Sequence, residues 1–178
     1  MAKTQGWRRS AGGVRACVSL LILMTLGIGS AAAQEAPSTV VRKGCSATDA
    51  AALEGMMARW RDGYNGGRAA DVGALYREDA VYLTQHFAGG IVNGRPAIQA
   101  YVQRGVDAKY HIDAITLLKM ECAGALGYVI DRYESTNNGR KAMGVNLVVV
   151  RKEQGRWRIV AHEAAVPGPD AIQKLDVK

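Results

Sequence analysis

The second half of this chain holds four successive segments with the pattern of β-strands, at about residues 111–121, 124–135, 140–152 and 157–165. Apolar and polar residues alternate along them, and short turns such as Asn137-Asn138-Gly139 and Gln154-Gly155 separate them. Turns of this length join antiparallel neighbours. The segments therefore predict one long antiparallel meander, against which the rest of the chain must pack.

The residues before the meander have a helical pattern. Apolar residues between 52 and 60 recur at helical spacing, Ser46 or Thr48 can cap the start, and the Asn-Gly-Gly at 65–67 ends the helix. A second short helix carries Val72, Leu75 and Tyr76, and a third begins near Pro96. Two short strands, at 80–84 and 89–92, lie between these helices. Helices first and a meander last predict the α+β class.

Two stretches resemble a known superfamily. Residues 78–82 read Glu-Asp-Ala-Val-Tyr with Asn-Gly-Arg following at 93–95, and residues 155–162 read Gly-Arg-Trp-Arg-Ile-Val-Ala-His. With the helix order, they make the chain similar to the nuclear transport factor 2-like superfamily, especially its SnoaL-like and ketosteroid isomerase-like members. The resemblance implies one domain at 47–167, a cone-shaped α+β barrel. Three N-terminal helices would pack in a strongly curved, mostly antiparallel sheet of about six strands, around a mostly apolar pocket.

The N-terminus predicts export. Residues 3–15 carry four basic residues and no acidic one, residues 16–29 are uncharged and apolar, and small residues occupy 30–33. This is a signal-peptide pattern, with cleavage expected before Gln34 and a periplasmic or secreted product. An uncleaved membrane anchor is the alternative, although the apolar run is shorter than the roughly 20 residues of a spanning helix. We expect a linker at 34–46 and a flexible tail at 168–178.

Removal of the signal changes the charge of the chain. Four of the 23 basic residues and none of the 16 acidic residues lie in 1–33, so the formal charge falls from +7 to +3. No basic block with interleaved aromatic residues remains, and we therefore expect no nucleic-acid partner.

Two cysteines, Cys45 and Cys122, remain after Cys17 leaves with the signal. In an oxidising compartment an even number of cysteines suggests a disulfide, but two unpaired, half-buried thiols are an equal alternative. No further cysteine or suitably spaced histidine accompanies either one. The sequence predicts neither a metal site nor a cofactor.

The turns also predict which strand residues share a face. Hairpins centred on residues 138–139 and 154–155 pair Ile130 with Leu147, and Leu147 with His162. One face then holds Tyr128, Ile130, Arg132, Val145, Leu147, Val149, Val160 and His162. The other holds Val129, Asp131, Tyr133, Asn146, Val148, Trp157, Ile159, Ala161 and Glu163. The resemblance places the first face toward the pocket and the second outside, where we expect homodimerisation. Asp131, Asn146 and Glu163 would form a solvated or dimer-bridging row there, with a weak cation site as the less favoured alternative.

The resemblance also suggests what the pocket lacks. The carboxylate base, the oxyanion tyrosine and the buried acid of ketosteroid isomerases fall on Thr84, Trp60 and Leu147, which makes that mechanism improbable here. We expect His162 and Arg132 as candidate catalytic residues. The expected ligand-binding residues are Trp60, Tyr76, Tyr82, Thr84, Tyr101, Tyr128, Leu147 and Val160.

Three functions follow as alternatives. The first is a secreted domain that binds a small, partly apolar ligand. The second is a cofactor-independent isomerase, cyclase or lyase in which His162 is acid or base and Arg132 and tyrosine hydroxyls orient the substrate. The third is a homo-oligomerisation module, which predicts a filled interior and a large apolar outer face of the sheet.

Overall fold

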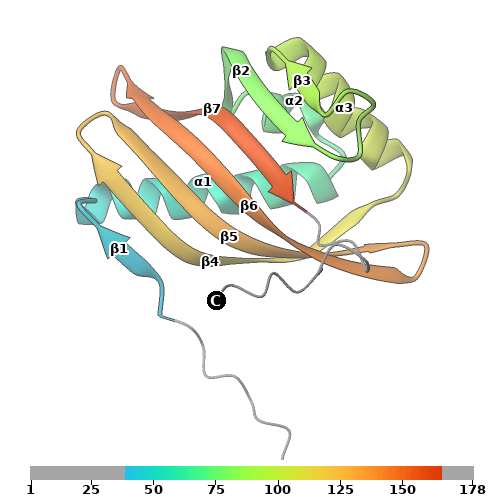
Figure 1. Cartoon of the computed structure of the whole chain (residues 1–178), viewed down its shortest axis with the longest axis horizontal. Helices are drawn as coiled ribbons and strands as arrows, with labels where there is room; N and C mark the ends of the chain where they lie inside the picture. Colours follow the sequence, from blue (N-terminus) through green and yellow to red (C-terminus); the bar gives the residue numbers. More distant parts are fainter. Residues whose placement is uncertain (1–38, 166–178) are drawn as a thin grey trace, which may run out of the picture. The chain divides into compact units, whose positions relative to one another are not determined.

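The computed structural model describes residues 39–165 (Figure 1). The predicted signal peptide at 1–33, residues 34–38 of the predicted linker and the predicted tail at 168–178 lie outside the described residues. Within the described range, none of the helices combines the length and apolar composition that crossing a bilayer requires.

Three helices precede the meander, as predicted: α1 Ala47–Asn65, α2 Ala69–Gly73 and α3 Arg95–Asp107. The backbone N–H of Asp49 donates to Ser46 Oγ at 3.1 Å, so Ser46 is the N-cap of α1. The buried face of α1 includes Leu53, Met56 and Trp60, the side chains that recur at helical spacing. Figure 1 shows the helices on one face of the sheet, with α1 lying across its long strands.

Within residues 39–165 the sheet has seven strands. They are β1 Val41–Lys43, β2 Tyr76–Thr84, β3 Ile91–Asn93, β4 His111–Ala123, β5 Leu126–Asn137, β6 Arg140–Glu153 and β7 Arg156–Ala165. Their order is β1-β4-β5-β6-β7-β2-β3, with β1–β4 and β2–β7 parallel and the other pairs antiparallel. The predicted α+β fold with a curved, mostly antiparallel sheet is confirmed. Two details differ: the expected linker contains β1, and Tyr76 begins β2 instead of extending the second helix.

The predicted faces of the sheet are inverted. The predicted register of β5 and β6 is correct, with Ile130 paired to Leu147. However, Val129, Asp131 and Val148 are buried against the helices, whereas Arg132 is exposed and Leu147 is 39% exposed. The face predicted to be outside is therefore the inner face, and its buried side chains are inaccessible to a second copy of the chain. Alternation alone separates two faces without saying which one the helices cover.

One β-bulge explains why His162 points inward as predicted, although the other residues assigned to its face point outward. Near the hairpin tip β6 and β7 pair as predicted, but the register shifts by one residue between Val149 and Val150. Val160 is the extra residue on β7, and beyond it His162 pairs with Val148 instead of Leu147. The shift turns His162 inward and leaves it 1% exposed.

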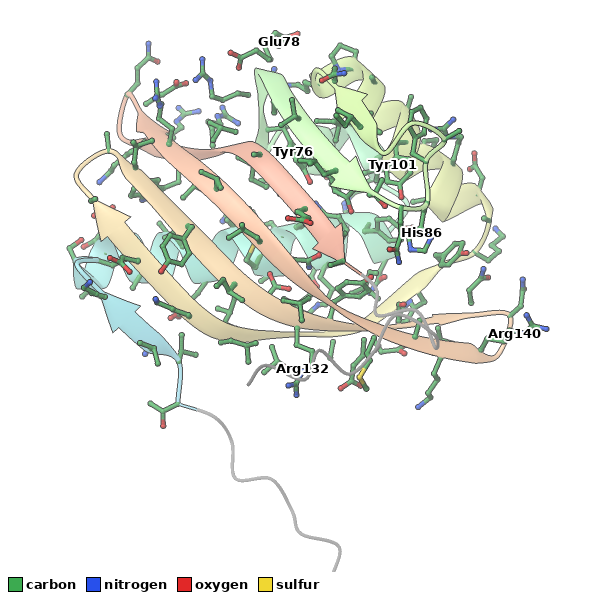
Figure 2. All side chains as sticks on the ribbon, viewed as in Figure 1. Tyr76, Glu78, His86, Tyr101, Arg132 and Arg140 are labelled. Carbon is green, nitrogen blue, oxygen red and sulfur yellow. A yellow bond between two sulfur atoms is a disulfide. The ribbon has the colours of Figure 1, made fainter. Side chains whose placement is uncertain are left out.

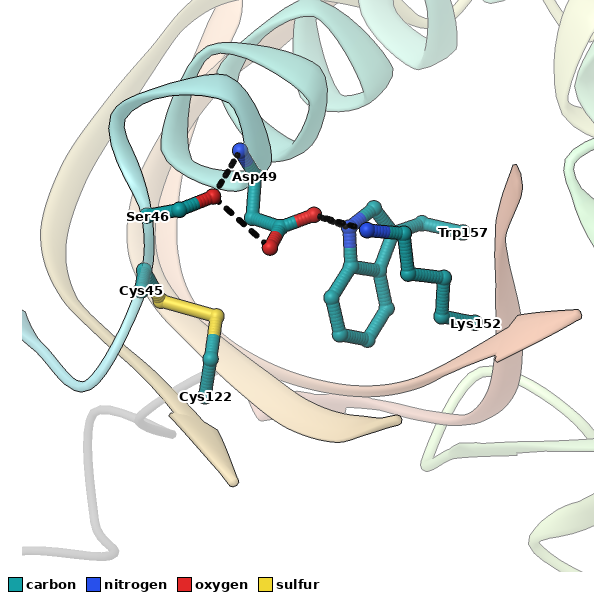
Figure 3. A network of polar contacts seen from close by, with 6 residues as sticks. All are labelled: Cys45, Ser46, Asp49, Cys122, Lys152 and Trp157. Atoms are coloured by element: carbon teal, nitrogen blue, oxygen red, sulfur yellow. Dashed lines mark hydrogen bonds and ion pairs between the residues drawn. A yellow bond between two sulfur atoms is a disulfide. The ribbon is translucent and has the colours of Figure 1, made fainter. Parts of the chain in front are cut away.

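Covalent and polar contacts fix the start of α1 (Figure 3). A disulfide joins Cys45 to Cys122, with Cα atoms 4.7 Å apart, and so settles the choice that the sequence left open. Asp49 accepts hydrogen bonds from Lys152 Nζ at 2.6 Å and Trp157 Nε1 at 2.9 Å. These bonds, with that from Ser46, lower the pKa of Asp49 to about 2. The first turn of α1 is thereby tied to the β4–β5 and β6–β7 ends of the sheet.

Candidate functional site

A cavity of about 780 Å³ opens between the inner face of the sheet, helices α1 and α3, and the loop after β2. Among the side chains that line it, seven are aromatic: Trp60, Tyr64, Tyr82, Phe87, Tyr101, Tyr110 and Tyr133. Tyr82 and Tyr101 pack with ring centroids 5.3 Å apart, and Trp60 stacks on Tyr64 at 5.4 Å. The walls of the cavity are therefore suited to a flat, apolar body.

The charged side chains of this cavity are all basic. Its lining includes Arg104, Arg140 and Lys141, with the imidazole of His86, and no aspartate or glutamate among the described residues. The guanidinium carbon of Arg104 lies 5.3 Å from the ring centroid of Phe87 and 5.7 Å from that of Tyr101. Figure 2 shows His86 and Tyr101 near the β2–β3 loop and Arg140 at the turn between β5 and β6. This distribution favours an anionic group on the bound molecule.

A hydrogen-bonded chain runs behind the aromatic wall. Trp60 Nε1 donates to Tyr76 Oη at 3.0 Å, and Tyr76 Oη lies 2.7 Å from His162 Nδ1. Because the indole can only donate, the Tyr76 oxygen accepts from it and the Tyr76 O–H is free to donate to Nδ1. Burial lowers the pKa of His162 to about 3, so the ring is neutral and carries its proton on Nε2. That N–H has no hydrogen-bond partner among the described residues.

A buried carboxyl group lies on the same inner face. Asp131 is 0% exposed, and its Oδ1 accepts a hydrogen bond from Asn146 Nδ2 at 2.8 Å. Its Oδ2 has no partner within the described part of the chain. Burial raises the pKa of Asp131 to about 7, although the bond from Asn146 acts in the opposite direction. Asn146 itself lines the cavity. A single carboxyl so placed can take up or release a proton near neutrality.

Several predicted ligand-binding residues do meet at this site. Trp60, Tyr82 and Tyr101 line the cavity. Thr84 is buried, with its Oγ1 3.3 Å from Tyr101 Oη, and Tyr76 is buried one layer behind the lining. Together with His162, these residues form one continuous cluster of rings and hydroxyls.

The remaining predicted site residues lie elsewhere. Arg132 is exposed and Leu147 is partly exposed on the outer face, while the Tyr128 hydroxyl donates to Glu121 Oε2 at 2.9 Å. Val160 is half-buried at the β7 bulge and is not part of the cavity lining. The expectation that these four line the pocket is wrong because it rested on the inverted face. Arg132 and His162 consequently do not face a common cavity.

Sequence reasoning missed the basic side chains at the cavity and assigned Asp131 to a solvated row. The signal for Asp131 was available in its neighbours, since Val129 and the cross-strand Val148 flank the Asp131–Asn146 pair on the same face. Glu163, the third member of that row, is exposed on the opposite face.

A second, smaller hollow of about 430 Å³ contains charges of both signs. Arg77 lies 3.2 Å from Asp79 and 3.3 Å from Glu153, and Arg95 lies 3.0 Å from Glu78. These partly exposed ion pairs satisfy one another. No group of three or more metal-ligating side chains occurs among residues 39–165.

Comparison with known proteins gives a consistent result. The SnoaL-like domain family matches residues 46–163. Among curated protein sequences, none matches the chain.

Solved structures share the fold at low sequence identity. Rv3472 from Mycobacterium tuberculosis, a protein of unknown function, is 17% identical with a TM-score of 0.62, covering 73% of this chain and 83% of that one. A putative scytalone dehydratase from Novosphingobium aromaticivorans is 17% identical with a TM-score of 0.54, covering 67% and 84%. A ketosteroid isomerase-like protein from Erwinia carotovora atroseptica is 18% identical with a TM-score of 0.54, covering 67% and 96%.

Proposed function

The chain belongs to the SnoaL-like domain family, and from that premise we propose that its cavity binds a small, planar, partly apolar molecule that carries an acidic group. The observation that carries this proposal is the lining of the cavity, in which seven aromatic side chains accompany two arginines, one lysine and the imidazole of His86. No carboxylate among the described residues shares that lining. Aromatic walls provide apolar contact area, and the basic groups provide the charge that fixes the orientation of an anion.

The size of the cavity supports this proposal. Pockets for small molecules usually measure about 300–1,000 Å³ and combine apolar walls with a few polar groups. The cavity of about 780 Å³ has both properties. It also counts against one of the two expectations of the homo-oligomerisation alternative, a filled interior.

The enzyme alternative was based on two residues, His162 and Arg132, that do not lie together. It required His162 and Arg132 to approach one bound molecule, but Arg132 is exposed on the outer face. Because burial lowers the pKa of His162 to about 3, its Nδ1 is also a poor base near neutrality. Ligand binding is therefore the function that the geometry favours.

We expect naphthalene-2-sulfonate, a planar aromatic anion, to bind the mature protein and to depend on Arg104 for its affinity. Arg104→Gln should weaken binding roughly 2- to 5-fold, since a partly exposed ion pair contributes up to about 1 kcal/mol. Arg132→Gln removes one positive charge from the outer face and should change the dissociation constant less than about twofold. Isothermal titration calorimetry measures both variants.

Equal losses in the two variants would show that net charge alone attracts the probe. Absence of binding to the wild-type protein would refute the proposal. Native mass spectrometry of protein purified from its own compartment would in addition identify any molecule that occupies the cavity.

We also propose that residues 1–33 direct export and are removed. The Cys45–Cys122 disulfide supports this, because such bonds persist mainly in oxidising compartments. N-terminal sequencing of protein recovered from outside the cytoplasm is expected to begin at Gln34. Recovery of an intact residue 1 in the membrane fraction would instead indicate an anchor.

A further inference from the structure

Three polar side-chain atoms are buried without a partner in the described part of the chain: Asp131 Oδ2, Asn137 Oδ1 and His162 Nε2. Asn137 lies at the end of β5 and lines the cavity itself, whereas Asp131 and His162 lie deeper on the inner face of the sheet. Buried polar atoms almost always have a hydrogen-bond partner, supplied by protein, water or a ligand. Neither Asp131 nor His162 is part of the cavity lining, but each contacts a residue that is: Asn146 donates to Asp131, and the Tyr82 ring packs against the His162 ring. A molecule that reaches past these lining residues can supply the missing partner.

His162 offers a donor. Its Nδ1 is occupied by the Tyr76 hydroxyl, which leaves the proton of the neutral ring on Nε2. The imidazole lies 4.6 Å from the Tyr82 ring and 5.7 Å from the Trp60 ring, measured between centroids. Both of those rings line the cavity. The Trp60–Tyr76–His162 chain thus fixes both the tautomer and the orientation of the imidazole.

Asp131 offers an acceptor. Asn146 holds Oδ1 and leaves Oδ2 available. Asn146 and Tyr133, the neighbours of Asp131 across and along the sheet, both line the cavity. No lysine or arginine of the described residues forms an ion pair with this carboxyl group. A donor from outside the chain would satisfy it.

The two residues occupy neighbouring rungs of the sheet. Asp131 pairs with Asn146, and His162 pairs with Val148, the next inward residue of β6. They therefore project from the two strands on either side of β6 into the same interior. The basic residues Arg140 and Lys141 lie at the other end of this stretch of β6, about 17–20 Å from Asn146 at the rise of an extended strand.

We propose that Asp131 and His162 form a polar floor directly behind the residues that line the cavity, and that they bind a hydroxyl group of the ligand. The ligand O–H donates to Asp131 Oδ2, and its oxygen accepts from His162 Nε2–H directly or through one water. This inference rests on the proposed function and extends it. The ligand class becomes a planar aromatic anion with a hydroxyl group at the end remote from its acidic group.

The chemistry of the floor selects a hydroxyl group over other groups. Above pH 7, where Asp131 is ionised, a carbonyl oxygen would satisfy the imidazole but offers nothing to the carboxylate. An ammonium group would satisfy the carboxylate but not the imidazole N–H, and the basic cavity lining would repel it. A hydroxyl group both donates and accepts, so it matches both atoms.

A matched pair of probes tests the floor. At pH 8, where Asp131 is mostly ionised, wild-type protein is expected to bind 6-hydroxynaphthalene-2-sulfonate roughly 10-fold more tightly than naphthalene-2-sulfonate, because the hydroxyl group pairs with a charged, buried acceptor. Asp131→Leu, close in volume, should abolish this preference, and Asp131→Asn should reduce it at least threefold. Glu163→Gln removes an exposed carboxylate from the outer face and should leave the preference unchanged. Calorimetry gives all eight dissociation constants.

Each other outcome is decisive. Equal binding of the two probes by wild-type protein would mean that ordered water already satisfies the floor, and would overturn this inference while leaving the proposed function intact. A preference that survives in both Asp131 variants would place the hydroxyl group elsewhere and would also overturn it. Failure of either probe to bind wild-type protein would remove the proposed function and this inference with it. If Asp131→Leu does not fold, Asp131→Asn decides alone.

Discussion

Replacement of both Cys45 and Cys122 with alanine is expected to lower the free energy of unfolding by about 4 kcal/mol. The two cysteines are 77 positions apart, and a bond across a loop of that length removes much of the freedom of the unfolded chain. The loss should appear in chemical denaturation as a lower midpoint with an altered slope, since the unfolded state becomes less compact.

In the native structure, few other contacts near the entry to α1 can compensate for the loss of the disulfide. Strand β1 has three residues and pairs only with β4, from Val41–Lys119 to Lys43–Glu121. Without the disulfide, the entry to α1 depends on this short parallel pairing and on the contacts of Asp49 with Lys152 and Trp157. We therefore expect β1 to detach before the sheet unfolds.

Reduced wild-type protein is the control for this variant. It should unfold at the same denaturant concentration as the double variant, because both lack only the cross-link. Neither cysteine lines the cavity, so the affinity for naphthalene-2-sulfonate should stay within about twofold of the wild-type value. A stability loss below about 1 kcal/mol would contradict the expectation and would imply a strained bond or a compact unfolded state.

The sequence predicted those parts of the fold that depend on local pattern. The Asn-Asn-Gly turn at 137–139 fixes the register of β5 and β6, and the spacing of Leu53, Met56 and Trp60 identifies the buried face of α1. Strand β1 was missed because three residues carry no periodicity and pair with a strand far along the chain. Tyr76 was misplaced because its partner across the sheet, Ile159, is equally distant.

The candidate site was predicted less well, for two physical reasons. Alternation along β5 and β6 gave two faces of similar apolar content, and only packing against α1 decides which one is buried. The bulge at Val160 has no sequence signature, yet it alone turns His162 inward. Aromatic residues such as Tyr82 and Tyr101 were found because they adjoin recognisable motifs. Arg140 and Lys141 were not found, because whether they line the cavity depends on where the β5–β6 hairpin ends in space.

Asp131→Asn is expected to reshape the pH dependence of stability, because Asp131 and His162 respond to pH in opposite senses. Burial raises the pKa of Asp131 from 3.8 to about 7, so its native protonated form stabilises the protein fully below pH 3.8, and that contribution disappears as the pH rises through 7. Burial lowers the pKa of His162 from 6.5 to about 3, so its contribution is complete above pH 6.5 and disappears as the pH falls through 3. Between pH 4 and 6.5 the two slopes, each about 1.4 kcal/mol per pH unit, should cancel in the wild-type protein.

The variant should expose the slope of His162 alone. From pH 4 to 6.5 the unfolding free energy of Asp131→Asn is expected to rise with pH while that of the wild-type protein stays level. The unfolding free energy of the variant minus that of the wild-type protein should be on the order of 3–4 kcal/mol larger at pH 8 than at pH 4. Urea unfolding at pH 4, 6.5 and 8 measures this, with Glu163→Gln as the control for loss of an exposed carboxylate. Every other titrating group is present in both proteins, so its contribution cancels in the difference between the two curves. Parallel curves for the variant and the wild-type protein would therefore mean that Asp131 ionises as it does in water. Asp131 would then not be the buried acid of the cavity floor.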